Sequence, residues 1–207
     1  MRKIDTVLGR LDKEYPDADI ALLFDGVFQL LVAVMLSAQC TDVVVNKVTP
    51  RLFAKFGDAV AMAKADVREV EKLIYSTGFY RNKARNVVGA ARMIVADFGA
   101  EVPCEMEDLL KLPGVARKTA NVVMNAGFGK AVGIVVDTHV GRISRLLGLT
   151  EQKDAVKVEK ELMKIVPKKK WGRLPYLFIE HGRKVCIARR PQCRDCVLSD
   201  ICPSSQV

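Results

Sequence analysis

Apolar residues recur at three- and four-residue intervals along almost the whole chain, and no segment alternates apolar and polar residues as a half-buried strand would. This spacing matches the α-helix, which turns one face toward a core at every third or fourth position. The pattern therefore predicts an all-α protein. With 207 residues, 50% of them hydrophobic, the chain is long enough to bury one or two helical cores.

Capping residues and helix breakers set the expected helix boundaries. The segment 28–38 is apolar on nearly every side, so we expect a helix buried in the middle of the molecule. Thr41 can cap the next helix, and Pro50 predicts a bend or a fresh start within it. Asp66 and Asn82 each stand where a further helix would begin. The remaining expected helices span residues 66–76, 82–98, 105–111, 117–126, 137–148, 154–166 and 170–185.

The net charge of +9 is concentrated toward the C-terminus, where residues 151–207 hold 13 Lys and Arg against seven Asp and Glu. A basic stripe attracts a polyanion, most commonly nucleic acid, although a merely soluble surface explains the charge equally well. No apolar run reaches the roughly 18 residues of a membrane span, and no signal-peptide core follows the basic N-terminus. We expect a cytoplasmic protein, associated with the nucleoid in a prokaryote.

Four of the six cysteines lie in the last 22 residues with the spacing C-x6-C-x2-C-x5-C: Cys186, Cys193, Cys196 and Cys202. Structural disulfides are not expected, because the cytosol keeps thiols reduced. Four thiolates within 17 residues can converge on one centre, which predicts metal ligation. The spacing alone does not distinguish zinc from an iron–sulfur cubane, since both take four thiolates. The isolated Cys40 and Cys104 are expected to be small packing or capping residues.

Basic residues stud the four-cysteine segment: Arg183, Lys184, Arg189, Arg190 and Arg194. Their density suggests that the metal orders a phosphate-binding surface and need not react. The alternative role is charge compensation, because a cubane bound by four thiolates carries net negative charge.

A tight turn joins two of the expected helices at Leu112-Pro113-Gly114-Val115-Ala116, because Pro and Gly both oppose helix continuation. The next helix starts near Arg117. Backbone N–H groups at such a helix start bind phosphate without sequence preference. Turns of this kind are common, so by itself this one only favours DNA binding.

Two side chains at helix starts are candidates for chemistry. Lys118 follows Arg117 in the first turn of its helix, where positive charge favours the neutral, nucleophilic amine. Such an amine can attack a sugar carbon and form a Schiff base, and an ordinary phosphate contact is the plainer alternative. Asp137 follows an apolar run and is either an N-cap or a carboxylate that stabilises positive charge on a deoxyribose. His139 is either a structural hydrogen bonder or a catalytic or DNA-contacting residue.

Together these motifs resemble the endonuclease III family of the helix–hairpin–helix DNA glycosylases. They occur in family order and cover essentially the whole chain. The family has a [4Fe–4S] cluster bound by this cysteine spacing, so the resemblance favours the cubane over zinc. The motifs are Leu36-Ser37-Ala38-Gln39-Cys40-Thr41-Asp42, Leu112-Pro113-Gly114-Val115-Ala116-Arg117-Lys118-Thr119-Ala120, Val136-Asp137-Thr138-His139-Val140 and the four-cysteine segment.

The resemblance implies two α-helical domains that flank a DNA-binding cleft. Residues 22–132 would form a six-helix barrel domain with the hairpin, and residues 1–21 with 133–207 an iron–sulfur domain. The implied enzyme is a monomeric bifunctional glycosylase and AP lyase of base excision repair. It would remove oxidised pyrimidines from damaged double-stranded DNA and cleave 3′ of the abasic site by β-elimination through a lysine Schiff base.

Site residues follow from the same resemblance. Lys118 would be the nucleophile and Asp137 the catalytic aspartate, while Gln39 and Phe79 would fill the gap left by an extruded nucleotide. The expected DNA contacts are Gln39, Phe79, Leu112, Gly114, Val115, Ala116, Arg117, Thr119, His139, Arg142, Arg189, Arg190 and Arg194.

Four departures from the family pattern affect the expected lesion preference and leave the reaction class intact. One is the loop from Lys118 to Asp137, which is a residue longer than in some bacterial members. Ala116 replaces a glycine common in the hairpin, which requires a negative φ or a relaxed turn. Phe79 stands in place of an aliphatic wedge, and its alternative role is packing in the core beside Tyr80. Leu110 stands where some relatives carry an acidic residue.

Two other functions are compatible with parts of the sequence. A monofunctional adenine glycosylase of the same superfamily is one, and Lys118 at the nucleophile position argues against it. The other is a non-catalytic helix–hairpin–helix DNA-binding protein with a zinc-stabilised tail. Visible absorbance near 400 nm and activity on a damaged duplex would distinguish it from an iron–sulfur enzyme.

Overall fold

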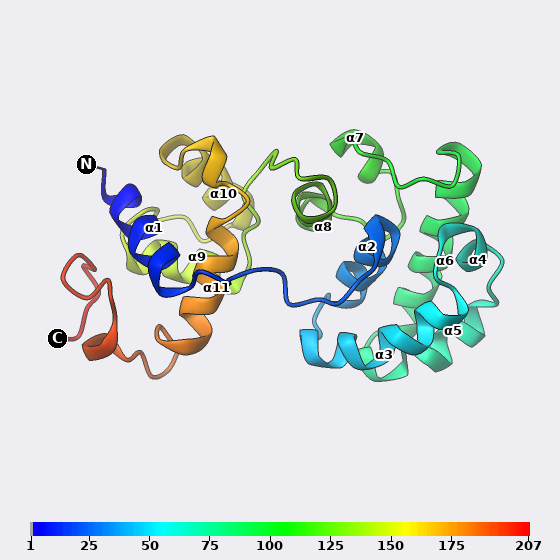
Figure 1. The fold of residues 1–207 in the computed structure, drawn as a ribbon, viewed down its shortest axis with the longest axis horizontal. Coiled ribbons are helices and arrows are strands. Elements are labelled where there is room, and N and C mark those ends of the chain that lie inside the picture. Colours follow the sequence, from blue (N-terminus) through cyan, green and yellow to red (C-terminus); the bar gives the residue numbers. More distant parts are fainter. Residues whose placement is uncertain (1) are drawn as a thin grey trace. The chain divides into compact units, whose positions relative to one another are not determined.

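The computed structural model describes residues 2–207, and these residues form helices and loops without a strand (Figure 1). The expected all-α class is therefore confirmed. The helices are α1 (Lys3–Glu14), α2 (Gly26–Leu36), α3 (Asp42–Lys55), α4 (Ala59–Ala63), α5 (Val67–Leu73), η1 (Tyr75–Thr77), α6 (Tyr80–Asp97), α7 (Met106–Leu109), α8 (Arg117–Val122), η2 (Val123–Gly127), α9 (Thr138–Leu146), α10 (Ala155–Ile165), η3 (Lys168–Lys170), α11 (Leu174–Lys184) and η4 (Cys193–Asp195).

The chain divides into two compact units. The central unit is Ala21–Lys130, and the terminal unit combines residues 2–20 with Ala131–Val207. The resemblance implied domains of 22–132 and of 1–21 with 133–207. Each unit has its own buried core and is described separately below.

The terminal unit is closed by contacts between the two ends of the chain. Helix α1 packs on α11, which also packs on α9. Arg173 donates from Nε to Asp12 on α1 over 3.0 Å and from Nη2 to the carbonyl oxygen of Tyr15 over 2.9 Å. Lys170 Nζ donates to the same Asp12 carboxylate over 2.5 Å. These partly buried bonds hold the N-terminal helix against a segment more than 150 residues away in the sequence.

The central unit is built around α2. Its residues 30–36 are all buried, and α3, α6, α8 and η2 pack on it. Helices α4 and α5 cover α6 in turn. The expectation of a helix buried on nearly every side is confirmed, because seven successive apolar residues leave no face for solvent.

Several helix boundaries differ from expectation: the helix expected at 170–185 begins at Leu174, the helix expected at 28–38 spans 26–36, and neither Pro50 nor Asn82 starts a helix. Pro50 lies inside α3, which runs unbroken, because buried Val48 and Leu52 on either side pack the helix into the unit. Helix α6 begins at Tyr80 rather than Asn82. Phe79 takes a left-handed conformation with φ 47° and its carbonyl oxygen accepts from the N–H of Asn82 over 3.0 Å, so the helix starts earlier than any capping side chain indicated.

Two helical glycines of the terminal unit have opposite surroundings, which predicts opposite effects of alanine. A Cβ on Gly182 of α11 would lie 2.4 Å from His139 Nδ1 and 3.1 Å from Ile143 Cδ1, whereas a Cβ on Gly9 of α1 meets no atom within 4 Å. Gly182→Ala should lower the free energy of unfolding by about 1–3 kcal/mol through overpacking. Gly9→Ala should raise it by up to about 1 kcal/mol through helix propensity. Thermal unfolding of both variants beside the unchanged protein checks this, and a Gly182→Ala protein as stable as wild type would contradict the packing.

Candidate functional site

The expected hairpin is present between α7 and α8. Gly114 has φ 77°, and a Cβ placed on it would lie 2.8 Å from Cβ and from Nδ2 of Asn86 on α6. Both the backbone conformation and the close neighbour therefore require glycine. The N–H of Val115 donates to the carbonyl oxygen of Leu112 over 3.1 Å and closes the turn.

The side chains of the hairpin divide into buried and exposed groups. Leu112 and Val115 are buried, so only their backbone is available to a ligand. Gly114, Ala116 and Arg117 are exposed. Ala116 has φ −97°. This negative φ is the conformation that an alanine in place of glycine requires, and any residue can adopt it. The turn thus exposes backbone at the start of α8 and anchors itself through its two apolar side chains.

Lys118 lies in the first turn of α8 and is exposed to solvent. The same helix buries Ala120 toward the core of the central unit and continues into the π-helix η2. The structure therefore places the candidate amine on the solvent side of a helix that is fixed by its opposite face.

Asp137 caps α9 in the terminal unit. Its Oδ1 accepts from the N–H of Val140 over 2.8 Å, directly after the buried run 134–136. The predicted N-cap is confirmed, and a catalytic role can coexist with it. His139 lies in the first turn of α9. Its Nδ1 is buried and has no hydrogen-bond partner in the part of the chain that the structure describes. A structural hydrogen-bonding role therefore does not apply to that nitrogen atom.

Gln39 and Phe79 share an unusual backbone conformation and a common cavity in the central unit. Their φ angles are 52° and 47°, in the left-handed region that residues other than glycine seldom adopt. Phe79 is 67% exposed, and the ring of Tyr80 contacts that of Tyr75 in a tilted arrangement with 4.8 Å between ring centroids. The alternative that Phe79 packs in the core beside Tyr80 is therefore wrong. The cavity, of about 220 Å³, is lined by Met35, Ala38, Gln39, Phe79, Asn82, Lys83, Asn86 and Gly114.

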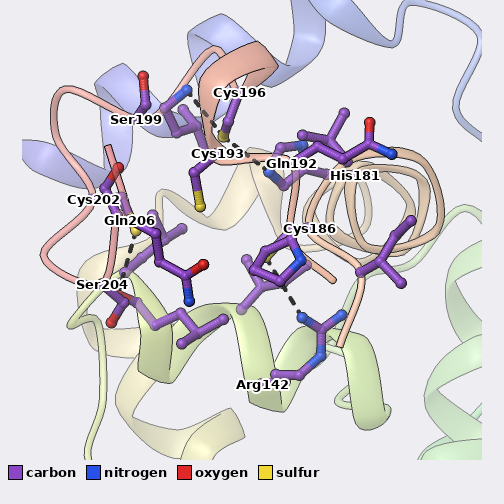
Figure 2. Close-up of a pocket in the computed structure, with 18 of the residues that line it drawn as sticks. Arg142, His181, Cys186, Gln192, Cys193, Cys196, Ser199, Cys202, Ser204 and Gln206 are labelled. Atoms are coloured by element: carbon purple, nitrogen blue, oxygen red, sulfur yellow. Dashed lines mark hydrogen bonds between the residues drawn. The ribbon is translucent and has the colours of Figure 1, made fainter. Parts of the chain in front are cut away.

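The four clustered cysteines line a second cavity, of about 240 Å³, within the terminal unit. Figure 2 shows them around this space, with Arg142 reaching Cys186 from α9. Arg142 Nη1 donates to Cys186 Sγ over 3.5 Å, so this residue, which the resemblance placed among the DNA contacts, also interacts with the cysteine site. Among residues 2–207, no group of three or more His, Cys, Asp or Glu side chains is arranged to hold a single metal ion.

His181 joins the cysteine site to α1 of the terminal unit. Its Nε2 lies 3.5 Å from Cys196 Sγ and its Nδ1 lies 3.1 Å from the hydroxyl of Tyr15. Burial, and then the positive charge of Arg142, lowers the pKa of His181 to about 4. The imidazole is therefore neutral at pH 7 and has one N–H to donate and one nitrogen to accept.

Burial raises the pKa of Cys186 and that of Cys196, and neighbouring cysteines raise both further. Arg142 acts in the opposite direction on Cys186, as does the N–H of Leu198 on Cys196. Two positively polarised groups thus already face the sulfur atoms. This electrostatic environment suits thiolates that, together with a bound metal centre, keep a net negative charge.

The four-cysteine segment is anchored by more than its cysteines. Leu198 is 1% exposed and belongs to the core of the terminal unit. Arg10 on α1 pairs with Asp200 over 2.5 Å and donates to the carbonyl oxygen of Val197 over 2.9 Å. The sequence suggested a segment with little apolar core of its own, and the buried Leu198 qualifies that expectation. Three arginines on the outer surface of the segment are exposed: Arg189, Arg190 and Arg194.

Sequence reasoning did not single out Lys83 or His181, both of which the structure buries next to candidate site residues. A polar residue on an otherwise apolar helix face could have indicated their burial: Lys83 lies beside Ala84 and Val87, and His181 lies beside Phe178.

Within residues 2–207, no helix has both the length and the apolar character that crossing a membrane requires.

The comparisons with known proteins agree with this geometry. Residues 32–168 match the family model for the HhH-GPD superfamily of base excision DNA repair proteins. The chain is similar to endonuclease III of Synechocystis sp., with 54% identity over 95% of this chain and 90% of the relative. It is also similar to endonuclease III of Bacillus subtilis, with 43% identity over 100% of this chain and 94% of the relative.

Two solved structures have a similar fold. A non-covalent endonuclease III–DNA complex superimposes with a TM-score of 0.92 at 45% identity, covering 98% of this chain and 94% of the other. A trapped covalent endonuclease III–DNA intermediate gives the same TM-score and identity over 98% and 95%. The chain belongs to the endonuclease III family of the helix–hairpin–helix superfamily, a family of DNA glycosylase/AP lyases that act in base excision repair.

Proposed function

We propose that this glycosylase/AP lyase removes oxidised pyrimidines from duplex DNA, with Lys118 as the nucleophile. The observation that carries the proposal is the position of Lys118, exposed in the first turn of α8 directly after the hairpin turn. An endonuclease III of similar fold has been trapped covalently on DNA, which supports a covalent route for this chain as well.

In the proposed reaction, the damaged nucleotide leaves the stack because its sugar carbon is inaccessible inside the duplex. The Lys118 amine then forms a bond to C1′ of the deoxyribose, and the bond between C1′ and the base breaks. Loss of a proton from nitrogen and opening of the sugar ring give an imine. Removal of a C2′ proton then breaks the bond between C3′ and its phosphate, which is a β-elimination.

Asp137 is proposed to stabilise the positive charge that develops on the sugar as the base departs. Its side chain accepts the Val140 N–H through Oδ1, and this bond fixes the carboxylate at a helix start. A preorganised negative charge acts most strongly where water is excluded. The Asp137→Asn substitution described below tests the simpler alternative, in which Asp137 only caps α9.

DNA contacts are proposed for exposed groups that bind phosphate without reading sequence. In the hairpin these are the backbone of Gly114 and the side chain of Arg117, and the half-buried Thr119 is proposed to add a contact. On the four-cysteine segment they are the exposed arginines. Gln39 and Phe79 are proposed to fill the space left by the extruded nucleotide. We further propose a monomer located in the cytoplasm.

A [4Fe–4S] cluster is proposed at Cys186, Cys193, Cys196 and Cys202. Four thiols around one cavity of about 240 Å³, faced by Arg142 and the Leu198 N–H, suit an anionic centre whose ligands bind different iron atoms. A zinc ion would need four sulfur atoms about a single point. When bound, the cluster would order the arginine-bearing segment, and the proposed reaction draws no step from it.

Lys118→Gln should abolish the covalent adduct that borohydride traps on a duplex with an oxidised pyrimidine, because only a primary amine at the sugar gives a reducible imine. Denaturing electrophoresis of the trapped complex measures it. Lys111→Gln removes another exposed lysine near the hairpin and should leave trapping intact. Undiminished trapping in Lys118→Gln would assign the nucleophile to another residue.

Asp137→Asn should slow excision by roughly a hundredfold while leaving thermal stability almost unchanged, because asparagine caps a helix as well as aspartate but carries no charge. Binding to damaged DNA should be at least as tight as in wild type, since a negative charge near phosphates is removed. Asp154→Asn is the matched control, because Asp154 caps α10 through the N–H of Lys157 over 3.0 Å. Normal excision by Asp137→Asn would leave Asp137 as a cap alone.

Cys193→Ser should eliminate absorbance near 400 nm and lower the iron content from about four atoms per chain, because one of the four iron ligands is lost. Thermal stability should fall with it, since metal binding contributes to folding. Cys104→Ser, a partly buried cysteine of the central unit, should change neither quantity. Zinc at one atom per chain in anaerobically prepared wild-type protein would contradict the cubane.

A further inference from the structure

Lys83 carries a buried amino group that has no part in the proposed reaction. It lies one turn after Phe79 on α6 and is 7% exposed. Burial lowers its pKa, with nearby Cys40 acting in the opposite direction. Burying an ammonium group is costly unless its N–H groups are hydrogen bonded, so a lysine in this position requires specific acceptors.

Both acceptors of Lys83 are backbone carbonyl oxygens at the ends of two separate elements. Nζ donates to Leu36 O over 2.8 Å and to Thr77 O over 2.7 Å. Leu36 is the last residue of α2, and Thr77 is the last residue of η1. Carbonyl groups at a helix end lack helical partners and form the negative end of the helix dipole, so a buried cation satisfies both.

Each acceptor directly precedes a segment that carries a left-handed residue. Gln39 follows Leu36 by three positions, and Phe79 follows Thr77 by two. Residues 2–207 contain only one other non-glycine residue with positive φ, Ala100. Left-handed backbone at such residues persists only when the surroundings determine it, so these two segments need an external constraint.

The side chains of Gln39 and Phe79 do not provide that constraint themselves, since both residues are exposed. They line one cavity of the central unit together with Lys83 and Gly114. One ammonium group thus bonds both segments and links the backbone that leads to Gln39 with the backbone that leads to Phe79. Asn86, one turn further along α6, contacts the hairpin at Gly114.

We propose that Lys83 is a positioning residue that holds the Gln39 and Phe79 segments at the spacing required to occupy the space of a flipped nucleotide. The inference rests on the proposed function of those two residues. A purely structural lysine would stabilise the central unit without affecting one substrate more than another.

The test compares two substrates in single-turnover reactions: a duplex with thymine glycol opposite adenine, and a duplex with an abasic site. Insertion matters for the first, where a base must be unpaired, and little for the second. Lys83→Met removes the donors and keeps an unbranched side chain of similar length. It should lower the ratio of excision to abasic-site cleavage by about tenfold, because insertion contributes only to the first rate. Lys83→Leu also removes the donors, should show the same selective loss and serves if Lys83→Met does not fold.

Two controls separate positioning from stability. Val87→Ala creates a cavity on the same helix, since Val87 is 1% exposed, and should leave the ratio unchanged. Lys83→Arg retains cationic donors and should restore most of the ratio. In a Gln39→Ala, Phe79→Ala background, Lys83→Met should cause no further change, because Lys83 would act through those residues.

A second readout is independent of excision. Fluorescence of 2-aminopurine beside a non-cleavable abasic analogue should rise on binding of wild type and less on binding of Lys83→Met at saturating protein. Equal losses of both rates with an unchanged fluorescence response would overturn the positioning role. Failure of wild type to excise thymine glycol would contradict the proposed function instead, and the fluorescence comparison would still test Lys83.

Discussion

Burial of α2 is the interaction on which the central unit depends. Its residues 30–36 are all buried, and α3, α6, α8 and η2 pack around it. Full burial of a leucine or valine side chain contributes about 1.5–3 kcal/mol, so this helix supplies a large share of the hydrophobic free energy of the unit. This packing also positions residues with proposed roles. The carboxyl end of α2 leads to Gln39, and α8, which packs on it, begins with Arg117 and Lys118.

The terminal unit depends on a different kind of constraint, which joins the two ends of the chain. Arg173 and Lys170 bond Asp12, and Arg10 bonds Asp200, so α1 is held by partners near the C-terminus. Exposed ion pairs contribute little stability, but these bonds also satisfy backbone carbonyl groups. They place Tyr15 beside His181, and His181 beside Cys196. The cysteine cavity is thereby tied to the N-terminal helix as well as to its own segment.

Helix ends carry most of the groups for which a role is proposed in this protein. Lys118 and Arg117 lie at the start of α8, Asp137 lies at the start of α9, and the carboxyl end of α2 receives the Lys83 ammonium group. Helix ends combine unsatisfied backbone groups with partial charge, so they bind phosphate, fix carboxylates and accept cations without additional elements. Within each unit, helix ends alone can therefore present the groups for which a role on DNA is proposed.

By itself the sequence determined the all-α class, the family, the glycine turn at Gly114, the N-cap at Asp137 and the grouping of four cysteines. These features depend on local backbone preference and short spacing, which neighbouring residues specify. Only the tertiary structure decided that α3 continues through Pro50, that Phe79 is left-handed and exposed, and that Lys83 is buried between two carbonyl groups. Those outcomes depend on contacts between segments distant in the sequence, where packing and the desolvation of a charge outweigh local propensity.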